Sequence, residues 1–387
     1  MNTQIIQKIL SRDFILCFFA QFAFTSVSFI LIPTLPIYLS RSGSTNVEIG
    51  ILIGAFGISS LILRPMIGRA LLSIPEKKFM LAGGILFAFT SMTYLFAPPF
   101  WPFFIVRIFQ GIGSAFFFTA AIVLIPNITP EAYRGQSIGY FFLSFNISMA
   151  LAPPFGMFLI NHFGFTILFL TCIVLSLVSL IISSKLSGGE AHLIDKPSGE
   201  SSSFINLKGF PPTFVYFFNH IIWGALTAFF PLYAINHHVT NPGLFFAAYA
   251  IVMISCRAFG GRILDIYSRE KVILPCLSVF ILSMTLLAFS KTLLMFILVA
   301  VISAIGHAFL VPSLIAYTLD LVGPDRGPGM GLLTAMGDLG MVLGPVIMGI
   351  ILHLADFTTM FLCLALSGLI NFTYFYLFAK KRKKVPF

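Results

Sequence analysis

Long apolar runs separated by short polar connections dominate the chain, and each run has about the 20 residues that a helix needs to cross a bilayer. Helices are expected because the unpaired edge of a strand cannot face lipid. Twelve membrane-spanning helices are predicted, at residues 14–39, 47–72, 78–97, 101–126, 134–160, 164–185, 212–235, 241–266, 271–290, 292–319, 327–353 and 357–379. The one long polar stretch is rich in Gly, Ser, Lys and Glu. It predicts a linker at 187–210 between domains at 1–186 and 211–387.

The composition agrees with an all-α polytopic membrane protein. Of the 387 residues, 58% are hydrophobic and 9% are charged, whereas a soluble domain has about 25% charged residues. The first apolar run, Phe14–Leu39, is too long for a cleaved signal peptide and has no small-residue cleavage site. The five cysteines lie in apolar runs without CxxC spacing, so they are expected to pack as apolar residues. No P-loop, GxSxG or HExxH motif occurs, and the chain is predicted to be neither an enzyme nor a cofactor or metal protein.

The net charge of +10 raises the question of nucleic-acid binding, but its placement indicates membrane topology instead. Outside the spans, nearly all Lys and Arg residues fall on the side of the two termini, and only Arg41 and Lys291 fall on the other. Because positive loops stay in the cytoplasm, both termini and the linker are predicted to be cytoplasmic, with no nucleic-acid partner. No Asn-x-Ser/Thr motif lies in an outward loop, which favours a bacterial inner membrane.

The two halves of the chain repeat one another. Three pairs of landmarks recur in the same order and at nearly the same spacing: Arg64-Pro-Met-Ile-Gly-Arg69 as Arg257-Ala-Phe-Gly-Gly-Arg262, Arg134-Gly135 as Arg326-Gly327, and Ala152-Pro153 as Gly344-Pro345. Two pseudo-symmetric six-helix bundles are therefore predicted. Parallel repeats of this kind are typical of transporters that rock about a substrate site between the two halves.

The fourth span carries a further motif: Arg107, Gln110, Gly111, Gly113 and Ala115 follow the pattern R-x-x-Q-G-x-G-A, with the alanine one place late. With the repeat landmarks, this motif resembles the major facilitator superfamily over the whole chain. The resemblance implies the twelve-helix fold of that family, secondary transport, action as a monomer, and a role of the motif in proton coupling.

Two other signatures of that family are present. The loop signature after the second helix is clear in the second half and degraded in the first, where Leu72 replaces the aspartate and Glu76 takes the place of Arg269. The glycine and proline signature of antiporters is approximated by the eleventh span. The resemblance thus implies gating or conformational roles for Gly68, Arg69, Gly261, Arg262, Asp265, Arg269, Gly340, Gly344 and Pro345. Residues around Thr45, Arg64 and Pro130 also resemble the small efflux permeases, which export sugars, drugs and metal-chelating metabolites.

Two charges inside predicted spans are the candidates for proton coupling. Arg107 lies well inside its span, where a charge costs about 2.5–3.5 kcal/mol and must face protein or water. Asp338 is the only acid deep in a span, and its apolar neighbours ease its protonation. Their repeat equivalents, Ala300 and Asn146, carry no charge. The alternatives are that Arg107 only joins two helices, or that Asp338 makes a structural hydrogen bond or an ion pair with Arg107.

The substrate-binding candidates are polar or aromatic residues within spans: Gln21, Thr25, Gln110, Ser114, Asn146, Asn219, His220, Trp223 and His307. Each histidine is expected either to contact substrate or protons or to make an ordinary polar contact. Some of the 46 phenylalanines are expected to wall a cavity and the rest to face lipid. Such a lining suits a medium-sized organic compound with an anionic or zwitterionic part.

Glycines are expected to set how closely two helices approach. In the resembling fold the second and eleventh helices are neighbours, and Gly54 and Gly344 lie on them. Either the glycines only allow tight packing, or they let the halves slide. Sliding predicts that Gly344→Leu abolishes transport while the protein stays inserted.

These observations together predict a secondary active transporter that works by alternating access. Proton-coupled export of a drug, metabolite or metal-chelating metabolite is the leading hypothesis. Proton-coupled import of a small organic solute is the alternative, and a non-transporting membrane receptor or scaffold is the alternative of a different class.

Overall fold

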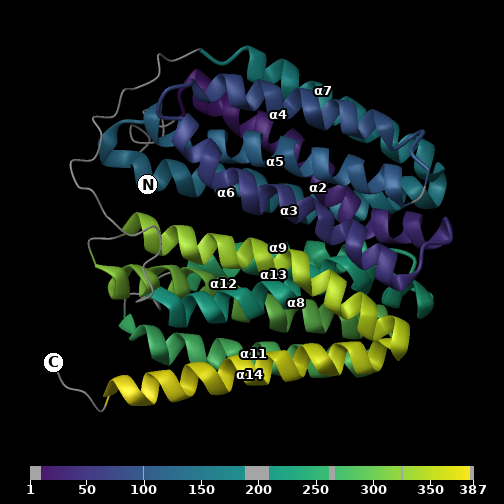
Figure 1. The fold of residues 1–387 in the computed structure, drawn as a ribbon, viewed down its shortest axis with the longest axis vertical. Helices are drawn as coiled ribbons and strands as arrows, with labels where there is room; N and C mark the ends of the chain where they lie inside the picture. Colours follow the sequence, from purple (N-terminus) through teal and green to yellow (C-terminus); the bar gives the residue numbers. More distant parts are fainter. Residues whose placement is uncertain (1–9, 99, 188–208, 261–265, 324–325, 384–387) are drawn as a thin grey trace. The chain divides into compact units, whose positions relative to one another are not determined.

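The computed structural model describes residues 10–98, 100–187, 209–260, 266–323 and 326–383, and helices make up nearly all of this part of the chain (Figure 1). The long helices in the described residues are α2 (Arg12–Arg41), α3 (Asn46–Ala70), α4 (Glu76–Thr93), α5 (Trp101–Asn127), α6 (Arg134–His162), α7 (Gly164–Ser184), α8 (Phe210–Asn236), α9 (Gly243–Gly260), α11 (Arg269–Phe289), α12 (Leu293–Val322), α13 (Arg326–Leu354) and α14 (Phe357–Lys383). A short 3₁₀ helix, η1 (Glu131–Tyr133), precedes α6.

Each predicted span overlaps one of these helices, and residues 261–265 of the span predicted at 241–266 lie outside the described residues. In the described part of the chain, 11 helices are long and apolar enough to cross a membrane. The remaining long helix, α4, has 18 residues and begins with the charged residues Glu76, Lys77 and Lys78. The predicted all-α fold of membrane-spanning helices is confirmed.

The chain divides into two compact units. Unit 1 contains the chain up to Tyr38 together with Ala55–Gly199, and unit 2 contains Leu39–Gly54 together with the chain from Glu200 onwards. Residues 39–54, which the sequence placed in the first domain, thus group with unit 2. The predicted linker lies almost wholly outside the described residues, so the domain boundaries at 186 and 211 stay a prediction.

The centre of unit 1 is built on one aromatic stack. The ring of Phe24 on α2 lies between Phe87 of α4 and Phe117 of α5, at centroid distances of 4.1 and 4.0 Å. Helices α4 and α5 approach closely because a Cβ on Gly83 would lie only 2.6 Å from the carbonyl oxygen of Gly113. Gly113 of the fourth-span motif therefore lets α4 and α5 pack closely. This packing fixes the position of α5, and with it the polar residues of the motif, within unit 1.

Unit 2 has a core between α8, α11, α12 and α14, and Val215, Phe280, Leu314 and Phe375 represent these helices in it. Residues 46–54 of α3 pack against α13 in the same unit. A Cβ on Gly50 would lie 2.3 Å from the carbonyl oxygen of Pro345, and Asn46 donates from Nδ2 to the carbonyl oxygen of Leu352 at 3.5 Å. The second and eleventh helices are in contact at these residues, as expected.

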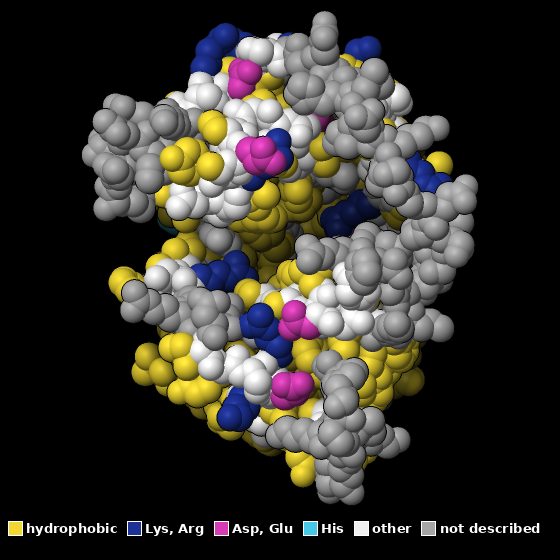
Figure 2. All heavy atoms as spheres, turned by 90° about the vertical axis from the view of Figure 1, so that its left-hand side faces the viewer, with side chains coloured by type: hydrophobic (Ala, Val, Ile, Leu, Met, Phe, Trp, Pro, Cys, Tyr) yellow, Lys and Arg dark blue, Asp and Glu magenta, His cyan; other side chains and the backbone are white. Residues whose placement is uncertain are grey.

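Charged side chains gather at helix ends. Figure 2 shows Lys and Arg side chains (dark blue) and Asp and Glu side chains (magenta) on a face where helices end. The ion pair of Arg134 with Glu131, at 3.6 Å before α6, is one example. This distribution is the one expected of helices whose middle parts cross hydrocarbon.

The end of α8 supplies a pH-dependent contribution to stability. Burial, and then the positive charge of Lys291 and the neighbouring His238, lower the pKa of His237. The folded state therefore binds fewer protons than the unfolded state, and stability is lost as the pH falls through the ordinary histidine range. We expect the melting temperature of Lys291→Gln to fall between pH 7 and pH 5 by roughly 1–2 °C less than that of the wild type. Thermal melts across this range test it, and parallel curves would contradict it.

Candidate functional site

Arg107 lies on α5 inside unit 1 and is 7% exposed. Its Nη1 donates to Oε1 of Gln110, one turn further along the helix, at 2.6 Å. Its guanidinium carbon lies 4.9 Å from the ring centroid of Phe56 on α3, which places the cation against an aromatic ring. The charge that the sequence singled out is thus held between a neutral amide and an aromatic ring.

Tyr94, directly after α4, completes this polar cluster. Its hydroxyl donates to the same Oε1 of Gln110 at 2.5 Å, and its fully buried ring packs on Phe103 and Phe169. Because both partners of Oε1 are donors, the amide of Gln110 must point its oxygen toward Arg107 and Tyr94. Its Nε2 is buried and has no hydrogen-bond partner in the part of the chain that the structure describes. Gln110 therefore orients Arg107 and keeps a donor available.

The approach of α3 to α5 depends on the glycine after Gln110. A Cβ on Gly111 would lie 2.2 Å from the carbonyl oxygen of Phe56, and Ser59 donates from Oγ to the carbonyl oxygen of Ile108 at 2.8 Å. Any larger residue at 111 would separate the two helices. The motif spacing thus brings Phe56 over Arg107, a contact that the sequence analysis missed.

A second polar and aromatic cluster lies in unit 2. The hydroxyl of Tyr249 on α9 is hydrogen-bonded to Nδ1 of His307 on α12. Trp223 of α8 packs its ring on Tyr249 at a centroid distance of 4.9 Å and meets His307 edge-on at 5.9 Å. Phe280 of α11 meets His307 at 5.8 Å. The structure thus brings together the predicted residues Trp223 and His307 and adds Tyr249.

His220 lies on α8 and Asp338 lies on α13, and these two helices pack against one another. His220 donates from Nδ1 to the carbonyl oxygen of Tyr216 at 2.8 Å, because a carbonyl can only accept. Asp338 is partly exposed and stands next to Gly337, where a Cβ would lie 2.4 Å from the ring of Tyr216. Asn219 is 2% exposed, and its Oδ1 has no partner among the described residues. Asp338, His220 and Asn219 therefore come from facing helices of unit 2.

The other substrate candidates of unit 1 are Gln21 and Thr25 on α2, Ser114 on α5 and Asn146 on α6. Thr25 donates to the carbonyl oxygen of Gln21 at 2.7 Å and to Oγ of Ser148 at 3.1 Å, so it joins α2 to α6. The amide of Gln21 is fully buried, and neither of its polar atoms has a partner among the described residues. Asn146 is 8% exposed and Ser114 is partly buried. Thr25 therefore has a packing role that the sequence did not reveal.

The glycines of α13 face more than one neighbour: Gly340 and Gly344 face α8, whereas Gly349 faces Asn46 of α3. A Cβ on Gly340 would lie 2.4 Å from the carbonyl oxygen of Phe217, and one on Gly344 would lie 2.3 Å from that of Ile221. Both carbonyls belong to α8. Pro345 presents its own carbonyl oxygen to Gly50 of α3. Gly344 therefore packs on α8, and α3 meets α13 at other residues.

No group of three or more His, Cys, Asp or Glu side chains able to hold a metal ion occurs among the described residues. The five cysteines are free, and Cys17, Cys172 and Cys276 are buried. The candidate function of the clusters in the two units is binding through fixed polar, cationic and aromatic groups.

Comparison with known proteins agrees with this arrangement of helices and motifs. The model of the major facilitator superfamily matches residues 17–240 and 212–387. The chain belongs to this superfamily. Being a major facilitator superfamily protein, it is an integral membrane transporter of small molecules and not an enzyme.

The alignments with individual relatives extend over most of this superfamily member. It is 28% identical over 344 residues to an uncharacterised MFS-type transporter of Methanocaldococcus jannaschii, covering 85% of this chain and 88% of the relative. It is 25% identical over 355 residues to the staphylopine export protein of Staphylococcus aureus, covering 88% and 89%. The crystal structure of the nucleoside transporter NupG has a TM-score of 0.75 at 15% identity, and the match covers 95% of this chain and 99% of that one. The last likeness shows the fold alone.

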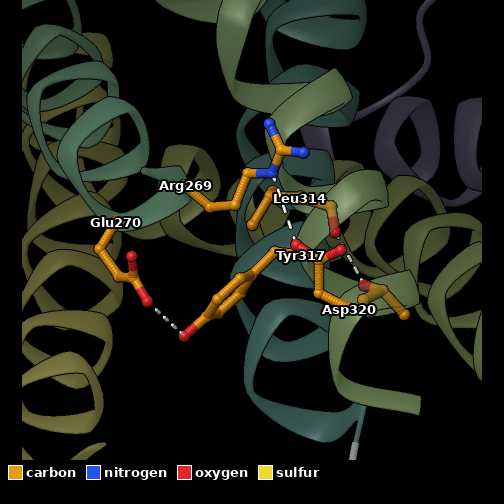
Figure 3. A network of polar contacts seen from close by, with 6 residues as sticks. Arg269, Glu270, Leu314, Tyr317 and Asp320 are labelled. Carbon is orange, nitrogen blue, oxygen red and sulfur yellow. Dashed lines mark hydrogen bonds and ion pairs between the residues drawn. The ribbon is translucent and has the colours of Figure 1, made fainter. Parts of the chain in front are cut away.

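The gating residues implied by the superfamily signature are partly described. Figure 3 shows Arg269 and Glu270, at the start of α11, pointing toward Asp320 and Tyr317 of α12. Nε of Arg269 lies 3.5 Å from Oδ2 of Asp320, and Tyr317 donates to Glu270 at 3.0 Å. Gly68 and Arg69 are exposed near the end of α3. Gly261, Arg262 and Asp265 lie outside the described residues.

The first half of this superfamily member has a related contact with different chemistry. Glu76, at the start of α4, accepts a hydrogen bond from Nδ2 of Asn127, at the end of α5, at 2.6 Å. In the repeat these residues correspond to Arg269 and Asp320. A carboxylate–amide contact thus stands where the second half has an ion pair, which agrees with the degraded loop signature of the first half.

Proposed function

We propose that this transporter exports a medium-sized organic compound with an anionic or zwitterionic part in exchange for protons. The observation that carries the proposal is the buried cation of Arg107, whose direction is fixed by Gln110, Tyr94 and Phe56. A fixed positive charge in a low-dielectric environment attracts an anionic group far more strongly than it does in water. Export is supported by the likeness to the staphylopine export protein.

In this proposal Asp338 takes up and releases the coupling proton during alternating access. The repeat gives each half its own charge, since Arg107 corresponds to Ala300 and Asp338 corresponds to Asn146. The domains are then the six-helix halves 1–186 and 211–387, joined by a linker at 187–210. The protein acts as a monomer in a bacterial inner membrane, with both termini and the linker in the cytoplasm, and does not bind nucleic acid.

Reconstituted vesicles with an imposed pH gradient test the proposal, with norfloxacin, a fluorescent zwitterion, as the probe. We expect norfloxacin to speed the collapse of the gradient in vesicles that contain the wild type. Asp338→Asn is expected to lower this proton flux at least tenfold and to keep norfloxacin exchange in the absence of a gradient, because exchange needs no net proton transfer. Asp356→Asn, in an exposed loop, is the matched control and should behave as the wild type.

Each outcome distinguishes the hypotheses. Proton flux without norfloxacin dependence, or none at all, contradicts the proposed function. Norfloxacin moving in the same direction as the protons identifies an importer. Full proton flux in Asp338→Asn assigns the coupling proton to another residue.

A further inference from the structure

His307 is held on several sides within unit 2. Its Nδ1 is hydrogen-bonded to the hydroxyl of Tyr249, and the rings of Trp223, Tyr249 and Phe280 pack around it at centroid distances of 5.9, 5.8 and 5.8 Å. Tyr249 and Phe280 are 1% and 3% exposed, whereas His307 and Trp223 are partly exposed. Tyr249 and Phe280 therefore form the buried part of the cluster, and His307 and Trp223 form its partly exposed part.

We propose that Tyr249 is a positioning residue that holds His307 as a neutral imidazole with its proton on Nε2, so that His307 donates a hydrogen bond to an acceptor atom of the transported compound. The inference rests on the proposed function, because it assumes that unit 2 contacts the substrate. It adds His307 to the residues that bind the substrate, and it excludes His307 from the pathway of the coupling proton.

The position of the proton follows from the chemistry of the two partners. A phenol hydroxyl is a good donor, and the unprotonated nitrogen of a neutral imidazole is a good acceptor. With Tyr249 donating to Nδ1, the single proton of neutral His307 is on Nε2. Protonation of Nδ1 would break this hydrogen bond.

The surroundings disfavour a charged His307. No acidic side chain is among the residues that contact His307 in the described part of the chain. The rings packed around it are those of Trp223, Tyr249 and Phe280, which bring no negative charge. An imidazolium there would lose hydration without gaining a negatively charged partner. His307 is therefore a neutral donor and not a carrier of protons.

Nε2 is the nitrogen left for a ligand. His307 makes its hydrogen bond through Nδ1 and packs its ring on aromatic neighbours, and Nε2 has no hydrogen-bond partner in the described part of the chain. Trp223 beside it offers an aromatic surface to the same ligand. The chemical class that fits is a conjugated or aromatic compound that carries a carbonyl or carboxylate oxygen.

The repeat indicates that this pair is not part of the common scaffold. The residues that correspond to Tyr249 and His307 in the first half are Phe56 and Ser114. Phe56 has no hydroxyl, and its ring lies against Arg107 instead. In each half the same aromatic position of the second helix thus packs on a polar residue of the fourth, but only in unit 2 does it fix a tautomer.

Nuclear magnetic resonance of ¹⁵N-histidine-labelled protein tests the tautomer without any substrate. The chain has seven histidines, and the signals missing from His307→Gln identify those of His307. We expect an unprotonated Nδ1 and a protonated Nε2 throughout pH 6–8 in the wild type, and a mixture of tautomers or a charged ring in Tyr249→Phe. A proton on Nδ1, or a charged His307 at pH 7 in the wild type, overturns the proposal.

Norfloxacin transport then tests the role. Tyr249→Phe keeps the ring and removes only the hydroxyl, so we expect KM for norfloxacin to rise roughly tenfold with kcat within about twofold. The matched control is Tyr233→Phe, which removes a hydrogen bond to the carbonyl oxygen of Ser290 in the same unit and should leave KM unchanged. An unchanged KM in Tyr249→Phe overturns the role in binding. Absence of norfloxacin transport by the wild type counts against the proposed function, while the resonance result stands by itself.

Discussion

Replacement of Arg107 by alanine is expected to lower the rate of norfloxacin efflux at least a hundredfold. Arg107 is 7% exposed, and its guanidinium is held by Gln110 and the ring of Phe56. Removing one partner of a buried charged contact costs about 2–5 kcal/mol, and a hundredfold loss corresponds to about 2.8 kcal/mol. Efflux from vesicles and the melting temperature should be measured on the same preparation, so that loss of transport is separated from loss of folding.

Two further variants at this cluster refine the test. Arg107→Lys keeps the charge without the planar fork, so transport is expected to fall less than in the alanine variant. Arg41→Ala removes an exposed arginine from the last turn of α2 and is the matched control, with efflux close to that of the wild type. Efflux of Arg107→Ala within about threefold of the wild type would leave Arg107 with a packing role only.

The sequence predicted the helices because each apolar run has the length that a bilayer requires and polar residues interrupt the runs. The span predicted at 101–126 is the helix Trp101–Asn127, and the span predicted at 164–185 is Gly164–Ser184. The contact of Arg107 with Gln110 can also be predicted from the sequence, because residues three apart share a helix face. The helices and this contact thus follow from the spacing of residues that are close in the sequence.

Contacts between distant residues explain what was missed. Tyr94, Phe56 and Tyr249 are aromatic residues among 46 phenylalanines and 11 tyrosines, and nothing in their local sequence separates them from lipid-facing ones. The one available signal was the repeat, which aligns Phe56 with Tyr249 and so marks one aromatic position in both halves. The hydrogen bond of Thr25 to Ser148 was not predicted for the same reason, since it joins helices far apart in the chain.

The second large effect is expected at Gly344, as a loss of folding. A Cβ there would lie 2.3 Å from the carbonyl oxygen of Ile221 and 3.0 Å from its carbonyl carbon and Cα, all of them backbone atoms of α8. Backbone cannot rotate away as a side chain can, so α8 and α13 would have to separate. Overpacking of this kind costs about 1–3 kcal/mol, and Gly344→Ala is therefore expected to lower the melting temperature by roughly 4–10 °C.

A glycine on the same helix provides the control. A Cβ on Gly331 would meet no atom within 4 Å, and alanine is the better helix former, so Gly331→Ala should melt within about 2 °C of the wild type or slightly above it. Gly344→Leu is expected to prevent unit 2 from folding, which differs from the sliding hypothesis, in which the leucine variant is inserted and folded but does not transport. A leucine variant that melts like the wild type while efflux is lost would support sliding. A melting temperature of Gly344→Ala equal to that of Gly331→Ala would show that α8 and α13 are not packed as closely as the structure places them.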